Sequence, residues 1–289
     1  MTVTQYVLTG RCPDKVGVIA GLTTTLARLG AWISESSHYG DDETGLFFVR
    51  AVFHINGSEE ETLQHLRQEL KTFRTDFSME LDIRPTARRM RVLLAVSKHG
   101  HCLNHLLHKW HSDELPVDVV GVVSNHDDMR RLVEWYDIPY HHMPIQNGDK
   151  RGQEKRMLQL MDDAQADLLV LARYMQVLSD EMCRDLEGRC INIHHSFLPS
   201  FKGAKPYHQA HARGVKVIGA TSHYVTSDLD EGPIIEQETV RVSHSLSADD
   251  YVRLGKDVEN VVLARAVQWH AERRILLNGQ RTVVFPPGI

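Results

Sequence analysis

The chain contains 289 residues, of which 42% are hydrophobic and 25% charged, a composition typical of globular proteins rather than of collagen-like or disordered chains. Its 33 Lys and Arg and 38 Asp and Glu leave a net charge of −5, so no overall attraction to nucleic acid or to an anionic membrane is expected. No apolar run approaches the ~18 residues that a bilayer span needs, and the first residues lack the features of a signal peptide. We therefore expect a cytoplasmic protein whose four cysteines, none in a CxxC pair, are reduced thiols.

The N-terminal part predicts a small α+β domain over residues 1–85. A β-like run at residues 5–9 is followed by a turn at Pro13 and Asp14, and Asp14 is predicted to cap a helix with one apolar face. Gly30 is expected directly after that helix. Two strands, a second helix and a last strand are predicted next, at residues 32–39, 45–55, from 58 onward, and 79–83. The order β-α-β-β-α-β is that of the ferredoxin-like split βαβ unit.

A polar, proline-containing linker at residues 84–89 leads into a second domain, which we assign to residues 86–289. Residues 216–226 and 233–242 flank an acidic turn and are expected to add antiparallel strands, and residues 248–271 to form a long closing helix. Four largely apolar runs separated by helical stretches predict buried parallel strands, at residues 90–96, 117–124, 166–172 and 190–193. The predicted fold class is α/β: a ferredoxin-like α+β domain followed by a doubly wound, mostly parallel sheet domain.

Several common cofactor and nucleophile motifs are absent. The chain has no G-x-G-x-x-G after the first strand of the second domain, no P-loop, no H-E-x-x-H and no G-x-S-x-G. We therefore expect no tightly bound cofactor. His101, His105 and His108 would share one helical face, but no further ligand is suitably spaced in the sequence, so no metal is predicted. His101 and Cys102 are instead expected to line a crevice.

The strand at residues 190–193 leads into two polar side chains that alternate along the chain. Asn192 and His194 would therefore point to the same face, at the end of a parallel strand where ligands usually bind. An amide and an imidazole there can polarise a carbonyl and stabilise an oxyanion, although two satisfied polar residues at a strand end would give the same pattern. The acidic, turn-rich stretch at residues 223–233 is either a solvated turn or folds over this pair. In the second case one carboxylate could keep the imidazole charged and receive a proton from water.

These two stretches carry a family resemblance. N-I-H-x-S-x-L-P from Asn192 and H-x-V-T-x-x-L-D-x-G-P from His223 resemble the enzymes that use 10-formyltetrahydrofolate, among them glycinamide ribonucleotide formyltransferase. The resemblance implies a catalytic trio of Asn192, His194 and Asp230, with His223 close to it. It also implies that the pterin ring is held by the segment Met175, Gln176, Val177 and Leu178 and by the loop from Thr226 to Asp230.

Two further segments bear on the choice between transfer and hydrolysis. Residues 97–102, Ser-Lys-His-Gly-His-Cys, replace the glycine-rich phosphate cradle of the transferases with bulky groups and resemble the S-K-x-x-H-C-L segment of the formyltetrahydrofolate deformylase family. The segment 201–207 is also shared with that family. On this resemblance His101 and Lys205 are expected to bind substrate. Transfer of the formyl group to an amine such as glycinamide ribonucleotide is the alternative.

The N-terminal segment C-P-D-K-V-G-V-I-A-G-L, residues 12–22, resembles an ACT domain, a regulatory module that binds small ligands. The resemblance implies a homo-oligomer formed through this domain and an amino-acid effector, glycine or methionine, at Asp14, Gly17, Ile19 and Ala20. A purely structural dimerisation module is the alternative.

An ACT domain ahead of a formyltransferase-like domain is the architecture of the formyltetrahydrofolate deformylases, and the resemblance then covers essentially the whole chain. It implies hydrolysis of 10-formyltetrahydrofolate to formate and tetrahydrofolate, which supplies formate for purine synthesis and balances the folate pools. A non-catalytic sensor of folate or amino acids on the same fold is a further alternative.

Overall fold

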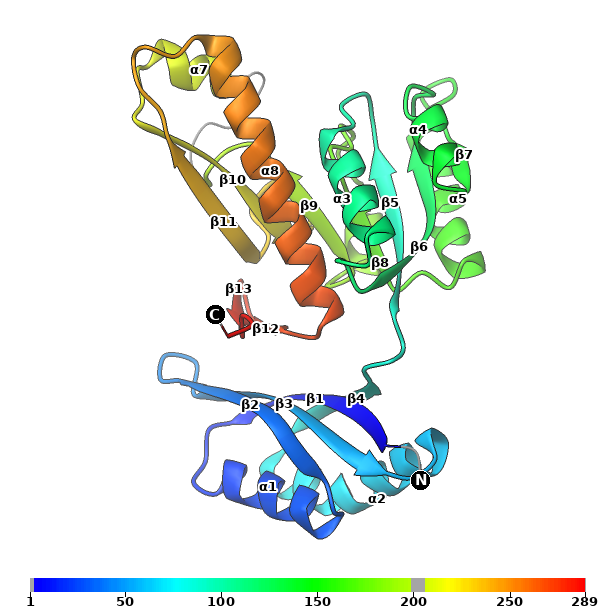
Figure 1. Ribbon diagram of the computed structural model, residues 1–289, viewed down its shortest axis with the longest axis vertical. Helices are drawn as coiled ribbons and strands as arrows, with labels where there is room; N and C mark the ends of the chain where they lie inside the picture. The colour runs from blue at the N-terminus through cyan, green and yellow to red at the C-terminus, as the bar shows by residue number, and fades with distance from the viewer. Residues whose placement is uncertain (1–2, 199–205, 289) are drawn as a thin grey trace. The chain divides into compact units, whose positions relative to one another are not determined.

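The computed structural model describes residues 3–198 and 206–288 (Figure 1). The chain divides into two compact units. The first comprises Met1–Arg89, Glu272–Asn278 and Val283–Ile289, and the second comprises Met90–Ala271 and Gly279–Thr282. The C-terminal segment thus belongs largely with the N-terminal unit, whereas the sequence analysis assigned everything after residue 85 to the second domain.

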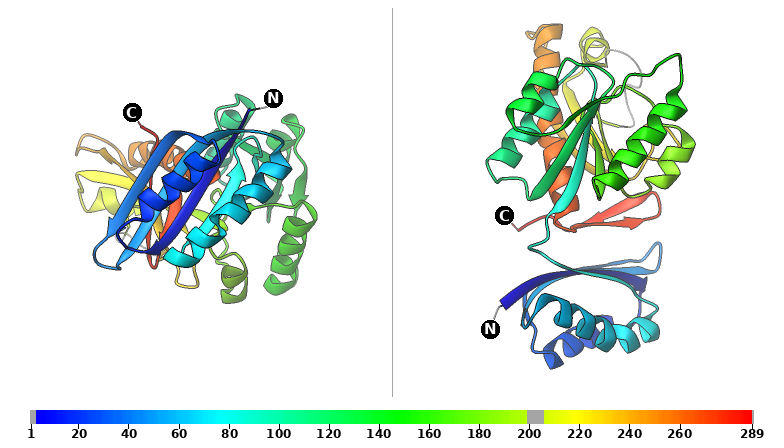
Figure 2. Two further views of the ribbon diagram at one scale, coloured as in Figure 1. Left: turned by 90° about the horizontal axis from the view of Figure 1, so that it is seen from below. Right: turned by 90° about the vertical axis from the view of Figure 1, so that its right-hand side faces the viewer.

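The first unit has the element order β-α-β-β-α-β. Its antiparallel sheet has the order β2-β3-β1-β4, and both helices lie on one face of the sheet (Figures 1 and 2). The elements are β1 (Val3–Pro13), α1 (Val18–Arg28), β2 (Trp32–Asp41), β3 (Leu46–Asn56), α2 (Glu59–Phe77) and β4 (Glu80–Pro85). This is the ferredoxin-like arrangement that the sequence predicts.

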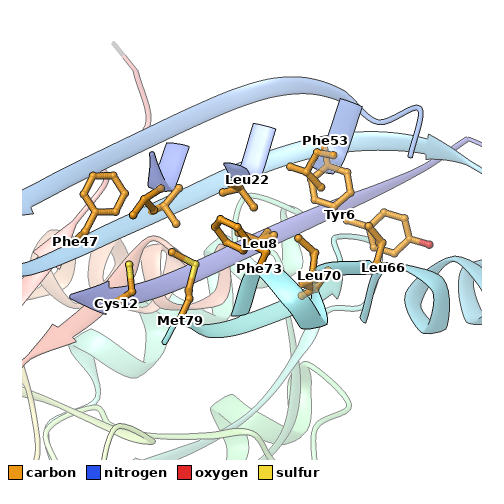
Figure 3. Packing of buried hydrophobic residues seen from close by; sticks show 14 of the residues in the cluster. Tyr6, Leu8, Cys12, Leu22, Phe47, Phe53, Leu66, Leu70, Phe73 and Met79 are labelled. Atoms are coloured by element: carbon orange, nitrogen blue, oxygen red, sulfur yellow. The ribbon is translucent and has the colours of Figure 1, made fainter. Parts of the chain in front are cut away.

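The core of the first unit lies between the sheet and the two helices. The helices contribute apolar residues at helical spacing, Leu22 and Leu26 from α1 and Leu66, Leu70 and Phe73 from α2. The sheet contributes alternate residues, and Figure 3 shows Tyr6, Leu8, Phe47 and Phe53 meeting the helical side chains.

The start of α1 differs from the prediction. Asp14 does not cap the helix; Gly17 occupies the N-cap position with a φ of 95°, and α1 has no side-chain cap. The reason is that β1 runs through Pro13 instead of ending at Thr9, so the turn needs the left-handed backbone that glycine adopts at low cost. The Asp14 backbone N–H donates to the Gly45 carbonyl at 2.8 Å. Gly30, with a φ of 72°, follows the end of α1 as predicted.

Polar contacts hold the C-terminal segment within the first unit. Arg274 Nη1 donates to Glu35 at 2.8 Å, Asn278 donates to Asp41 at 2.6 Å, and the buried Arg50 donates to the Glu272 carbonyl at 3.0 Å. Hydrophobic periodicity carries no signal for such contacts, which explains why the sequence analysis missed them. The segment forms a short hairpin, β12 (Ile275–Asn278) and β13 (Arg281–Val284).

The second unit is built on a mixed sheet of seven strands in the order β11-β10-β9-β8-β5-β6-β7. Strands β9, β8, β5, β6 and β7 run parallel to one another, and β10 is antiparallel to both β9 and β11. The strands are β5 (Met90–Val96), β6 (Val117–Ser124), β7 (Tyr140–His142), β8 (Leu168–Leu171), β9 (Cys190–His194), β10 (Val217–Tyr224) and β11 (Ile234–Arg241). The mostly parallel sheet and its antiparallel addition are as predicted.

Helices cover both faces of this sheet, with α3 and α8 on one side and α5 on the other (Figure 2). Met157 and Met161 of α5 pack on Leu93 and Leu169 of the sheet. The helices are α3 (His101–His111), α4 (Arg130–Trp135), α5 (Lys150–Asp163), α6 (Asp180–Asp185), α7 (Pro206–Ala212) and α8 (Ala248–Ala271). Among the described residues, no helix is both long enough and apolar enough to cross a bilayer.

Candidate active site

Strand β9 places Asn192 and His194 on one face of the sheet, since alternate residues of a strand point the same way. The antiparallel pairing with β10 puts His223 opposite Asn192 and Thr221 opposite His194. Directly opposed residues have neighbouring side chains. The register of these two strands therefore brings two imidazoles and an amide together at one place on the sheet.

The amide of Asn192 is oriented by His223. His223 Nδ1 lies 2.8 Å from the Tyr224 carbonyl oxygen, which can only accept, so Nδ1 carries a proton. When His223 is neutral, its Nε2 atom accepts a hydrogen bond from Asn192 Nδ2 at 3.2 Å, and when His223 is protonated its Nε2–H faces the Asp230 carboxylate instead. One N–H of the amide is used in this bond. The second remains for another acceptor.

Asp230 reaches this pair from the loop between β10 and β11. Strand β10 ends opposite the start of β9, with Tyr224 across from Ile191, so the loop must fold back to approach His194. Gly232 permits this path because a Cβ there would lie only 1.8 Å from the Tyr224 carbonyl oxygen. Asp230 has a φ of 58°, a left-handed backbone that Asp adopts more readily than most residues.

The carboxylate of Asp230 links both imidazoles. Its Oδ1 lies 3.2 Å from His194 Nδ1 and 3.7 Å from His223 Nε2. Burial favours a raised pKa for Asp230, but the hydrogen bonds and positive charge of His194 and His223 outweigh burial and hold this pKa well below its usual range. Asp230 is therefore an anion at neutral pH.

The imidazole ring of His194 is held in its orientation by two neighbours, Asp230 and His195. Its Nδ1 faces Asp230, and its ring stacks on that of His195, with centroids 5.1 Å apart and an interplanar angle of 23°. The side chain is only 5% exposed, and its Nε2 atom is buried without a hydrogen-bond partner among the described residues. A buried imidazole nitrogen with no partner is costly unless a ligand completes it.

A cavity of about 240 Å³ opens beside these groups. Asn192, His194, His223 and Asp230 all line it. The segments implied for the pterin ring line it too: Met175, Gln176, Val177 and Leu178 after β8, and Thr226, Ser227, Asp228 and Leu229 before Asp230. Met175 and Val177 are 53% and 56% exposed although apolar. Apolar side chains that line a cavity together with a few polar groups are typical of sites that bind small molecules.

Two residues expected to line the crevice are not among those that line this cavity. His101 and Cys102 do not line it, because the first turn of α3 faces α8, where His101 Nε2 donates to Glu259 at 2.8 Å. They are therefore not part of the described lining of this cavity, and their role toward a substrate stays a prediction. Lys205 lies outside the described residues.

His101, Cys102 and Glu259 form a cluster that the sequence analysis missed, with one ligand atom of each within 4.8 Å of the others. Glu259 belongs to helix α8, which is far from His101 in the sequence, so the spacing of residues around His101 does not predict it. Its carboxylate already accepts hydrogen bonds from His101 and from Tyr207 Oη at 2.7 Å, and the Arg173 guanidinium lies 3.5 Å away. Burial raises the pKa of the Cys102 thiol well above its usual value, which disfavours the thiolate that a metal needs. We assign no metal to this cluster.

The residues expected to bind an effector lie in the first unit, around the turn between β1 and α1. Asp14, Gly17 and Ala20 are exposed, whereas Ile19 packs partly against the core. Three of the four are thus accessible at the surface.

Residues 90–267 match the formyl transferase family, so the second unit is a formyl transferase domain. The phosphoribosylglycinamide formyltransferase of Anaplasma phagocytophilum is similar in fold, with a TM-score of 0.64 and 28% identity, but it matches only 70% of this chain while 97% of its own chain is covered.

Whole-chain similarity is more specific. The chain is 49% identical to the formyltetrahydrofolate deformylase of Corynebacterium sp. (strain P-1) over 281 residues, 97% of this chain and 98% of that protein. The crystal structure of formyltetrahydrofolate deformylase from Burkholderia mallei has a TM-score of 0.93 and 49% identity, covering 98% of this chain and 99% of that one. The chain belongs to the formyltetrahydrofolate deformylase family.

Proposed function

We propose that this chain hydrolyses 10-formyltetrahydrofolate to formate and tetrahydrofolate. The observation that carries the proposal is the convergence of Asn192, His194 and Asp230 on one cavity, in a chain whose family is named for this reaction. An amide donor, an imidazole and a carboxylate are the groups needed to polarise a formyl carbonyl and to activate water.

The pterin ring would lie between the segment Met175–Leu178 and the loop that begins at Thr226. Both segments line the same cavity as the trio, and both contain apolar side chains next to polar ones. A planar heterocycle needs this combination, because its faces are apolar and its edges donate and accept hydrogen bonds. The formyl group on N10 would then reach Asn192 and His194.

The reaction would proceed by attack of water on the formyl carbon. Asp230 orients the water and takes its proton, directly or through a second water, and keeps His194 protonated. Asn192 and the Nε2–H of His194 donate hydrogen bonds to the oxyanion as the carbonyl bond opens. The C–N10 bond then breaks, N10 takes up a proton, and formate and tetrahydrofolate are released.

The chain is expected to release formate from 10-formyltetrahydrofolate with no acceptor present, at a rate equal to the appearance of tetrahydrofolate. A coupled formate dehydrogenase assay, with tetrahydrofolate followed by its absorbance, measures both products. A transferase would release almost no formate in either case, and tetrahydrofolate would appear only after an amine such as glycinamide ribonucleotide was added, together with the formylated amine. A non-catalytic sensor would bind folate and release nothing in either case.

We further propose that the first unit is an ACT domain that binds an amino-acid effector and joins subunits. Its β-α-β-β-α-β order supports this, as do the exposed positions of Asp14, Gly17 and Ala20. Exposed Val16 and Trp32 in the same unit offer apolar surface for a second subunit. We also propose that the chain acts in the cytoplasm and that the formate it releases supplies purine synthesis. Both proposals rest on the proposed hydrolysis of 10-formyltetrahydrofolate.

Glycine or methionine is expected to change the turnover rate of the wild-type chain but not of a Gly17→Val variant. Valine would be strained at the left-handed backbone of residue 17, in the turn where the effector is placed. Calorimetric titration checks binding, and light scattering checks the oligomeric state. If neither amino acid binds or alters turnover, the effector is refuted, and if the chain is monomeric, so is the oligomer.

A further inference from the structure

Arg173 is the single Lys or Arg among the described residues that line the cavity. It follows β8 and precedes the segment Met175–Leu178. Its side chain is only 12% exposed. Arg173 therefore brings a largely buried positive charge to the wall of the cavity, and the proposed hydrolysis does not use it.

The backbone holds Arg173 in place. Its φ of 66° lies in the left-handed region, which a residue with a long side chain adopts only when its surroundings enforce it. Ser97, just after β5, provides the anchor. The Ser97 backbone N–H donates to the Arg173 carbonyl at 3.2 Å, and the Ser97 hydroxyl accepts from the Met175 N–H at 2.9 Å. Strain at a site of ligand binding is a common sign of function.

The guanidinium of Arg173 is poorly satisfied by the described residues. Its nearest anion is Glu259, whose Oε2 lies 3.5 Å from Arg173 Nε, and this Nε is buried with no hydrogen-bond partner. A guanidinium has five N–H donors in a planar fork. Its buried Nε–H has no acceptor among the described residues, although buried donors normally have partners.

Glu259 neutralises part of the charge but is itself occupied. It is 1% exposed and accepts hydrogen bonds from His101 and Tyr207. The Tyr207 ring packs on Gly255, where a Cβ would lie 2.1 Å from the ring, so α8 is shaped to receive it. Glu259 is thus fixed behind Arg173. The other N–H donors of Arg173 are therefore available to a ligand in the cavity.

We propose that Arg173 binds the carboxylate of formate, the one-carbon anion that leaves the trio after hydrolysis. This proposal rests on the proposed function. Formate carries a negative charge and forms beside the Asp230 carboxylate, which repels it. The planar fork of Arg173 matches a carboxylate, which can accept two parallel hydrogen bonds. Asp230 and Arg173 line the same cavity, so formate can move away from the carboxylate that repels it and bind the guanidinium without leaving the cavity.

The depth of Arg173 favours a one-carbon anion over the other carboxylates in the reaction. The glutamate tail of the folate lies beyond the aminobenzoyl ring, on the far side of N10 from the pterin. A tail of this kind needs a site near the mouth of a cavity. Arg173 is largely buried and is backed by the fully buried Glu259.

The first test is product inhibition by sodium formate. We expect Arg173→Gln to raise the inhibition constant of formate at least tenfold, and Arg173→Lys to raise it less, because lysine keeps the charge but loses the fork. Arg156→Gln removes an exposed arginine from α5 and should leave the constant unchanged. A wild-type inhibition constant in a folded, active Arg173→Gln variant would overturn the proposal. The proposal would also be overturned if Arg173→Gln raised KM for the folate substrate but not for a pteroate analogue that lacks the glutamate tail, because Arg173 would then bind the tail.

A second measurement does not depend on turnover. Carbon-13 formate titrated into the full chain should show line broadening that Arg173→Gln abolishes, and absence of broadening in the wild type would also overturn the proposal. The double variant Arg173→Gln, Glu259→Gln removes both buried charges and serves if the single variant does not fold; it too should lose formate binding. If the wild type releases no formate from 10-formyltetrahydrofolate but still binds formate through Arg173, the proposed function fails while the anion site stands.

Discussion

Replacement of Asp230 by Asn is expected to lower kcat for formate release by about 10²–10⁴, the usual contribution of a positioned acid or base. Asn is nearly the same size and tolerates the left-handed backbone at this position, so the loop should keep its course. The variant loses the charge that His194 faces at 3.2 Å, and with it the group that we propose takes the proton of water. Steady-state kinetics with 10-formyltetrahydrofolate measures the loss.

Asp228→Asn provides the matched control. Asp228 lies in the same loop and also lines the cavity, but it is exposed and forms no ion pair with either histidine among the described contacts. We expect its kcat to stay within a few-fold of wild type. Equal losses in the two variants would indicate a general effect of loop charge and would refute the specific role of Asp230.

The same substitution should change the pH dependence of stability. The pKa of Asp230 in the folded chain lies below the unfolded value of about 3.9, so its ionisation adds stability above about pH 4 and this contribution is lost as the pH falls through the folded pKa. The difference in free energy of unfolding between wild type and Asp230→Asn should therefore shrink as the pH falls below about 4. Urea denaturation at neutral and acid pH measures it, and a difference that grows toward low pH would refute the ion pair.

Replacement of Asn192 by Ala is expected to lower kcat by about 10²–10³ with little change in KM, because one donor to the oxyanion is lost. The segments around Met175 and Thr226 that we propose to hold the pterin ring are untouched, so folate affinity should remain. A tetrahydrofolate titration measures that affinity. Asn104→Ala, at an exposed position of α3, controls for the loss of an amide and should behave as wild type. A variant that lost affinity and kept kcat would make Asn192 a binding residue only.

Local patterns were sufficient for much of the fold. Apolar runs located the buried strands β5 and β6 at their observed bounds, and α8 likewise. Where a helix or strand begins and ends depends instead on how the strands pair in the folded chain. β1 continues to Pro13 because β3 pairs with it over that whole length, and this pairing moved the start of α1 away from Asp14.

The candidate site was predictable only in part. Alternation along one strand placed Asn192 and His194 on one face, but the return of Asp230 to them depends on the loop after β10 and on Gly232, and only the family resemblance pointed to it. Glu259 gave no signal, because its partners come from other helices far away in the chain. Contacts of this kind are set by packing and not by local periodicity.

The most direct measurement is the fate of the formyl carbon when 10-formyltetrahydrofolate is turned over in water enriched in heavy oxygen, with glycinamide added as a competing amine. Mass spectrometry of the products distinguishes the outcomes. We predict formate carrying one oxygen atom from the solvent, in equal amount to tetrahydrofolate, and no formylated amine. Formyl groups found on the amine, or formate without solvent oxygen, would contradict attack by water at the cavity of Asn192, His194 and Asp230.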